Sequence, residues 1–193
     1  MSTPLEKTQL QQIINLQENA SAFFEKVINN NNSEMKCGKG CTACCYTSLT
    51  VFPVEAARIT EYFETLPDLQ KENFKQKLNL PKESGTNLLG KQVKPCSFLH
   101  EGECLIYPVR PIICRTHGIP LKRLQQDKIL IDLCPLNFQE ELPQQEDWLD
   151  QDRLNLLLAL AQKNYASNLT SSLKNYEDAN GRIPLNLLKE SFL

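Results

Sequence analysis

Long apolar stretches are missing from this sequence of 193 residues. The longest run of purely apolar side chains extends over six residues, from Leu156 to Ala161, whereas a membrane-spanning helix needs about 20. The opening segment, MSTPLEKTQLQQ, has neither a basic region nor an apolar one, and a secretory signal has both. We therefore expect a cytoplasmic protein without membrane association.

A strong excess of charge of either sign is also missing. The chain carries 21 basic and 23 acidic side chains, which gives a formal net charge of −2. Nucleic-acid-binding domains usually carry a basic patch or a net positive charge, so the composition gives no support for nucleic acid as a partner. The sequence indicates no other partner either. It also lacks the P-loop, G-x-G-x-x-G, G-x-S-x-G and H-E-x-x-H motifs, so nucleotide binding, serine hydrolysis and zincin chemistry have no support.

Cysteine, in contrast, is abundant, and four of the eight cysteines lie in the segment CGKGCTACC, residues 37–45. An even number would allow disulfides, but the reducing cytosol disfavours structural bridges. A bridge between two adjacent cysteines would also be strained. Such a set is more typical of a metal site or of catalysis. We treat all eight as candidate metal ligands: Cys37, Cys41, Cys44, Cys45, Cys96, Cys104, Cys114 and Cys134.

The first three cysteines have the spacing C-x3-C-x2-C. Residues three and four positions apart lie on the same side of a helix or turn, so the thiolates of Cys37, Cys41 and Cys44 can converge. If the segment is helical, Cys45 is rotated by about 100° from Cys44, and the doublet should not supply two ligands to one tetrahedral ion. One of the two sulfurs could serve a second metal, bridge two metals or stay free as a reactive thiol. Radical S-adenosylmethionine enzymes share this spacing, but the sequence lacks their repeated strand–helix units.

The other four cysteines are dispersed from Cys96 to Cys134, and none of them forms a C-x2-4-C pair typical of zinc knuckles. The fold must therefore bring these ligands together, which couples metal binding to folding. His117 lies three residues after Cys114. It could reach the same centre, since mixed Cys/His sites are common, or it could simply pack or cap.

Three sequence blocks resemble those of the YkgJ-like cysteine-cluster proteins, which are described as zinc- or iron-chelating. The first is CGKGCTACC with the downstream pair Glu55-Ala56, the second is PCSFL followed by CLIYPVRPIICR, and the third is CPLN. Together they cover roughly residues 37–137. The resemblance implies that the cysteines bind metal. Because some relatives are described as flagellin lysine N-methylases, it also allows a protein-lysine methyltransferase or a redox enzyme.

Several cations flank the cysteines. A metal bound by four thiolates is anionic, so Arg110 and Arg115 in the second block could offset its charge. Arg110 is the stronger candidate, because a proline follows it. We expect Lys36 and Lys39, beside the first block, to be ordinary surface charges. Tyr107 could donate a hydrogen bond to a sulfur or pack as a core aromatic residue.

The spacing favours an iron–sulfur cluster over zinc. Zinc sites usually use ligand pairs two to four residues apart, and here only the first block offers them. An iron–sulfur cluster accepts a local triplet together with a distant fourth cysteine, and eight thiols exceed what one tetrahedral zinc ion can use. We predict a cytosolic metal-binding protein of undefined biochemical role. The alternatives are an iron–sulfur enzyme and a structural zinc module that mediates interactions.

The predicted fold is mainly α with short β-hairpins, and its irregular cysteine-rich core is organised around a metal centre. An N-terminal amphipathic helix with an Asn-rich linker occupies residues 1–33, the cysteine-cluster region residues 34–140, and a helical segment residues 141–193, all within one compact domain. Apolar periodicity and proline or polar breakers give the element bounds. We predict helices near 4–28, 53–64, 67–80, 145–165, 170–179 and 184–191, an extended segment at 49–52, and hairpins within 96–107 and 119–133.

Overall fold

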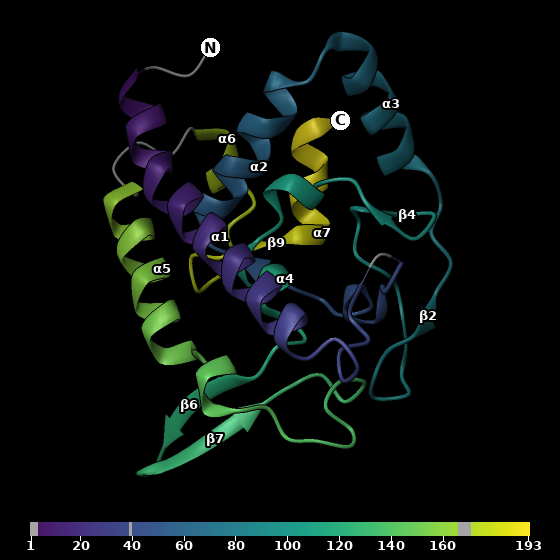
Figure 1. Ribbon diagram of the computed structural model, residues 1–193. Coiled ribbons are helices and arrows are strands. Elements are labelled where there is room, and N and C mark those ends of the chain that lie inside the picture. Colours follow the sequence, from purple (N-terminus) through teal and green to yellow (C-terminus); the bar gives the residue numbers. More distant parts are fainter. Residues whose placement is uncertain (1–3, 39, 166–170) are drawn as a thin grey trace.

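The computed structural model describes residues 4–38, 40–165 and 171–193, and Figure 1 shows how their elements are arranged. Helices dominate, as predicted. They are α1 (Pro4–Asn30), α2 (Pro53–Thr65), α3 (Asp68–Asn79), α4 (Ile112–Thr116), α5 (Gln151–Tyr165), α6 (Ser171–Lys174) and α7 (Leu185–Leu188). Single 3-10 turns lie at Ala43–Cys45, Tyr107–Val109, Gln145–Asp147 and Lys189–Phe192.

The strands are short and form small separate sheets. Three two-stranded antiparallel sheets pair β1 (Thr50–Val51) with β9 (Ile183–Pro184), β2 (Gly85–Thr86) with β3 (Gln92–Val93), and β4 (Leu99–His100) with β5 (Glu103–Cys104). A three-stranded sheet has the order β7-β6-β8, with β6 (Leu121–Gln125), β7 (Lys128–Asp132) and β8 (Leu149–Asp150). The prediction of a mainly α fold with short hairpins is therefore confirmed.

Helix α1 organises the packing. It crosses the molecule and contacts α2, α4 and α5 (Figure 1). Leu10, Ile13 and Ala20 are buried on one face of α1 in the main core, as expected for the apolar stripe of an amphipathic helix. About two turns beyond Ala20, Val27 belongs to a smaller core that forms where α1 ends. Its other buried members are Met35, Ile119 and Phe138.

The Asn-rich segment after α1 is a turn that is tied to the rest of the chain. The side-chain amides of Asn30 and Asn31 donate hydrogen bonds to the carboxylate of Asp147, over 3.0 Å and 2.7 Å. Lys26 lies 3.5 Å from the same carboxylate. Asp147 is only 2% exposed, so these three partners satisfy a buried charge.

One predicted helix differs clearly from the structure. The segment 145–165 is not a single helix, because α5 begins only at Gln151 and β8 precedes it, pairing in parallel with β6. The anchored Asp147 and the hydrogen bond from the amide of Leu149 to the carbonyl of Pro120, over 2.8 Å, hold this stretch extended. Asp150 then accepts a hydrogen bond from the amide of Arg153, over 3.0 Å, which is the contact of a helix N-cap.

The other predicted elements are present with changed bounds. Hairpin β6–β7 turns at Gln126 and Asp127, whose φ angles are 49° and 59°, as the tight hairpin turns that match strand twist require. The two C-terminal helices are shorter than predicted, and strand β9 between them was not predicted. In the described part of the chain, we find no helix with the length and apolarity needed to cross a bilayer.

Candidate metal centre

The first cysteine block is a loop that ends in a 3-10 turn. Gly40 has a φ of +90°, and the amide of Cys41 donates to the carbonyl of Gly38 over 3.1 Å. Cys44 and Cys45 lie in the turn Ala43–Cys45, and their thiols are hydrogen-bonded to each other. The helical spacing that we assumed for the doublet does not apply here, and the structure brings the two sulfurs together.

The second block joins the doublet from three directions. The amide of Cys96 donates to the carbonyl of Cys45 over 2.7 Å, Cys104 lies in β5 opposite Leu99, and Cys114 lies in α4. Each of these thiols is within electrostatic reach of others in the set. We call this set the five-thiol cluster, and its members are Cys44, Cys45, Cys96, Cys104 and Cys114.

Burial controls the protonation of the five-thiol cluster. It raises the pKa of Cys104 to about 11 and raises the pKa values of Cys96 and Cys114 as well, and neighbouring thiols add to the increase. The hydrogen bond within the doublet lowers the pKa of Cys44 to about 7, and the same bond, together with burial, raises the pKa of Cys45. The hydrogen-bonded pair of Cys44 and Cys45 is therefore the part of the cluster that ionises first.

The remaining cysteines form a second thiol group, which consists of Cys37, Cys41 and Cys134. Burial raises the pKa of Cys37 to about 11, and the charges of Cys134, Cys41 and Cys44 raise it further, against a hydrogen bond from Asn137 that lowers it. Cys44 is thus within electrostatic reach of both sets of thiols. Cys41 is exposed, whereas Cys134 is buried.

Asn137 of the third block holds the second thiol group in place. Its side-chain amide donates to the sulfur of Cys37 over 3.2 Å and to the carbonyl of Gly118 over 2.7 Å, and its oxygen accepts from the amide of Lys36 over 2.8 Å. The backbone of Gly118 passes close to the same sulfur, because a Cβ added there would lie 2.5 Å from it. Sequence reasoning included Asn137 only as part of the CPLN block.

Arg110 lies within electrostatic reach of the five-thiol cluster. Its positive charge lowers the pKa values of Cys44 and Cys104. The guanidinium stacks on the ring of Tyr107, with 3.9 Å between its central carbon and the ring centroid. Tyr107 is 62% exposed, so its role is to orient Arg110 rather than to fill the core.

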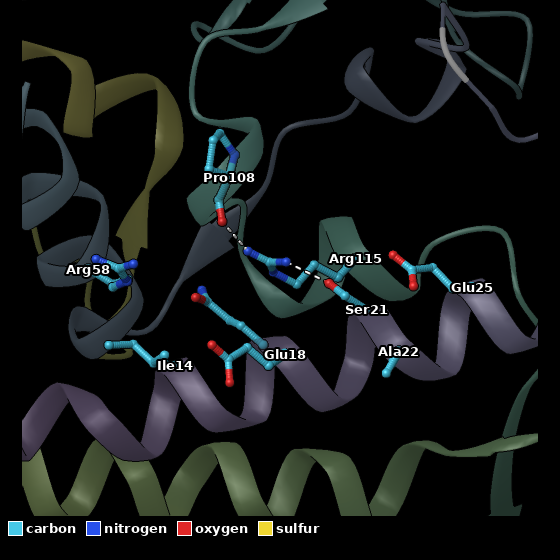
Figure 2. Close-up of a pocket in the computed structure, with 9 residues that line it drawn as sticks. Ile14, Glu18, Ser21, Ala22, Glu25, Arg58, Pro108 and Arg115 are labelled. Atoms are coloured by element: carbon cyan, nitrogen blue, oxygen red, sulfur yellow. Dashed lines mark hydrogen bonds between the residues drawn. The ribbon is translucent and has the colours of Figure 1, made fainter.

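Arg115 has a structural role instead. It is buried and donates to the carbonyl of Arg110 over 2.8 Å. It also donates to the hydroxyl of Ser21 and to the carbonyl of Pro108, each over 2.7 Å, as Figure 2 shows. Burial lowers its pKa to about 10, and Arg110 and Arg58 contribute to the decrease. These bonds hold the second block against α1. Arg115, Ser21 and Pro108 line a cavity of about 270 Å³.

Glu55 connects the first block to the second. This buried carboxylate accepts hydrogen bonds from the amide of Ile112, at the start of α4, over 2.9 Å and from the amide of Phe52 over 3.0 Å. Burial raises its pKa. The sequence did not lead us to predict this linking role for Glu55. The signal for it was a glutamate at the third position of the helix that begins at Pro53, where its side chain can reach back to the residue before the helix.

The other residues considered near the site are His117, Lys36 and Lys39. His117 ends α4, and its Nε2 is buried without a hydrogen-bond partner among the described residues. Burial lowers its pKa. The ammonium group of Lys36 donates a hydrogen bond to the carbonyl of Ser33 over 3.3 Å, and Lys39 lies outside the described residues. Within the described ranges, no three Cys, His, Asp or Glu side chains are arranged to hold a metal ion as they stand.

Partly buried thiols that come together from distant segments, with a cation beside them, are typical of cysteine-rich metal-binding proteins. The site places this protein in that class. Residues 36–135 match the CxxCxxCC family, whose description is "Putative zinc- or iron-chelating domain". This match covers more than half of the chain and includes all eight cysteines, so the chain belongs to that family. The description supports metal binding by zinc or iron. No curated protein and no solved structure matches the chain significantly.

Proposed function

We propose that this protein is a cytoplasmic iron–sulfur protein whose cofactor is held by the five-thiol cluster. The observation that carries the proposal is the convergence of five half-buried thiols from four separate segments of the chain: the turn Ala43–Cys45, the residue Cys96, the strand β5 and the helix α4. The family description supports a bound metal, and the set of thiol donors supports an iron–sulfur cluster as its form.

The chemistry of the donors fits a soft metal. Thiolates select iron–sulfur clusters and zinc over harder ions. Four cysteines suffice for an iron–sulfur cluster or for one zinc ion. The five-thiol cluster offers one thiol more than either needs, and the charge of Arg110 compensates part of the negative charge that four thiolates introduce.

Metal binding at this cluster must displace protons. Only thiolates act as ligands, whereas burial holds Cys96, Cys104 and Cys114 in the protonated form at neutral pH. The pair of Cys44 and Cys45, with the pKa of Cys44 at about 7, is the part of the cluster that is ready to bind first. We propose that the other sulfurs lose their protons and draw together as the metal enters, so that binding orders the segments that carry them.

A structural zinc site at the same five-thiol cluster is the second candidate. It is favoured by the packing of Cys96 and Cys104 against the main core, where a redox-inert ion would join β5 and α4 to the first block. The free state of all eight cysteines suits a reducing compartment in both cases, and this supports the proposed cytoplasmic location.

Purification without oxygen tests the proposal. The full chain is expressed with iron in the medium, and iron, zinc and acid-labile sulfide are measured per protein. We expect iron and sulfide in similar amounts, broad absorption in the visible range and bleaching by dithionite. A colourless protein with stoichiometric zinc and no sulfide would replace the iron–sulfur proposal by the zinc site. A protein that retains neither metal would contradict both.

A further inference from the structure

A groove lies beside the five-thiol cluster, away from the cavity next to Arg115. Its volume is about 520 Å³, within the range of about 300–1,000 Å³ that is typical of small-molecule sites. Four stretches of the chain form its walls: residues 47–49, 78–82, 94–97 and 185–190. The end of α3 and the helix α7 contribute to two of these walls. Cys96 is part of the lining, so the groove reaches the thiols.

The charge of the groove is positive although the protein as a whole is slightly acidic. Lys82, Lys94 and Lys189 line it, and Glu190 is the only acidic residue of the lining. Glu190 lies 3.5 Å from Lys189, whereas Lys82 and Lys94 have no carboxylate partner within the described residues. Two cations are thus left without compensation in a concave surface, where their field is focused.

Lys82 is fixed in this arrangement. Its ammonium group donates a hydrogen bond to the carbonyl of Leu99. Lys94 and Lys189 line the same groove, so an anion that binds there meets three cations.

Polar side chains without protein partners complete the lining. None of the hydroxyl and amide side chains of the groove forms a hydrogen bond in the described part of the chain. A ligand could therefore bind them without breaking an existing contact, whereas committed groups would first have to give up theirs. These side chains are Thr47, Ser48, Asn79, Ser97 and Asn186.

A bare metal cation would be repelled by this lining. An oxyanion would be attracted by the lysines, which bind carboxylate and phosphate groups as point charges, and would find hydroxyl and amide donors around it. We propose that the groove binds a small oxyanion with several negative charges, a polycarboxylate or a polyphosphate, next to Cys96. The anion site follows from the groove alone, whereas its position beside a metal rests on the proposed function.

Equilibrium dialysis of the full-length protein, as purified without oxygen, tests this inference. One set of dialyses uses labelled citrate and a second uses labelled pyrophosphate, which distinguishes the two sources of oxyanion. The groove variant is Lys94→Gln with Lys189→Gln. The matched control is Lys128→Gln with Lys163→Gln, which removes the same charge from two exposed lysines on β7 and α5. A third variant, Asn186→Ala, changes a donor of the groove without changing the charge.

We expect saturable binding of one of the two anions at one site per chain. The groove variant should weaken it at least tenfold, the control should leave it unchanged, and Asn186→Ala should weaken it about fivefold, as the loss of one hydrogen bond of about 1 kcal/mol does. Absence of saturable binding of both anions at millimolar concentration would overturn the inference, and so would equal losses in the groove variant and the control. Metal content is measured on the same samples. A protein that contains metal but binds neither anion would contradict this inference alone. A protein that binds an anion but contains no metal would contradict the proposed function alone.

Discussion

The side-chain amide of Asn137 donates a hydrogen bond to the sulfur of Cys37 over 3.2 Å, although 100 positions separate the two residues in the chain. Asn137 is 1% exposed, so this contact lies in the interior. It joins the last of the three cysteine blocks to the first. The same amide group bonds Gly118, between the two, and one side chain thus holds three distant segments together.

Replacement of Asn137 should therefore destabilise the fold. Asn137→Ala leaves the buried carbonyl of Gly118 without its partner, which costs about 1–3 kcal/mol. It also removes the hydrogen bond to the amide of Lys36, which contributes about 0.5–1.5 kcal/mol. We expect the free energy of unfolding in urea to fall by at least about 1.5 kcal/mol. Asn164→Ala is the control, because Asn164 is exposed and makes one hydrogen bond, to Gln12 over 2.9 Å. Equal effects of the two substitutions would contradict the bridging role.

The buried carboxylate of Glu55 should make stability depend on pH. Folding raises its pKa because the carboxylate is desolvated, so the native state binds a proton more tightly than the unfolded chain does. The free energy of unfolding gains this contribution fully below the ordinary carboxyl range. It loses the contribution as pH rises through the raised pKa. Urea unfolding at a series of pH values, from weakly acidic to neutral, measures the slope.

Glu55→Gln should remove that slope and lower stability at neutral pH by about 1–3 kcal/mol, because the amide oxygen can accept only one of the two backbone hydrogen bonds. Glu64→Gln is the control on the same helix. Glu64 is 65% exposed and 3.6 Å from Lys71, and an exposed pair of this kind contributes at most about 1 kcal/mol. A pH slope that persists in Glu55→Gln would assign it to another group.

Elements with a local signal could be predicted from the sequence, and elements with long-range causes could not. Proline before an apolar stripe gave α2, and a polar four-residue turn gave hairpin β6–β7. Strand β8 was not predicted, because its residues fit a helical period. It is extended only because Asp147 is anchored by Asn30 and Asn31, more than 100 positions earlier.

The cysteines of the site were evident from their spacing, but their grouping was not. Cys44 belongs to the five-thiol cluster because a 3-10 turn places its thiol against that of Cys45. Cys104 belongs to it because a hairpin carries this residue to the doublet. Neither depends on spacing within the first block. The roles of Glu55 and Asn137 are contacts between blocks, and such contacts have no pattern in a single sequence.

Serine substitutions should separate the two thiol sets. Cys104→Ser combined with Cys114→Ser leaves three thiols in the five-thiol cluster, one fewer than an iron–sulfur cluster needs, and we expect loss of the visible absorption and of most of the bound iron, because serine lacks the soft thiolate. Cys41→Ser affects the exposed member of the second thiol group, and the absorption should persist. If the double variant retained the full absorption while Cys41→Ser lost it, the metal would belong to the second thiol group.

The close approach of Gly118 to Cys37 gives the sharpest test of packing around the second thiol group. Gly118 has a φ of +105°, and a Cβ there would lie 2.5 Å from the sulfur of Cys37. Gly181 has a φ of +67° but would meet nothing within 4 Å. Gly181→Ala therefore reports the backbone cost alone, about 1–2 kcal/mol, and Gly118→Ala should cost clearly more because it adds the clash with the sulfur.

A double-mutant cycle isolates that extra cost. In the background Cys37→Ala the sulfur is gone, so Gly118→Ala should cost less than it does in the presence of Cys37, and the remaining close neighbour of the added Cβ is Nδ2 of Asn137, 3.2 Å away. The free energies of unfolding of the two single variants and the double variant are measured in urea, with reductant present throughout. A coupling of about 1–3 kcal/mol is expected for two groups in direct contact. Additive effects would show that the chain relaxes around the added methyl group, and that Gly118 is needed for its backbone conformation rather than for the space it leaves to the sulfur.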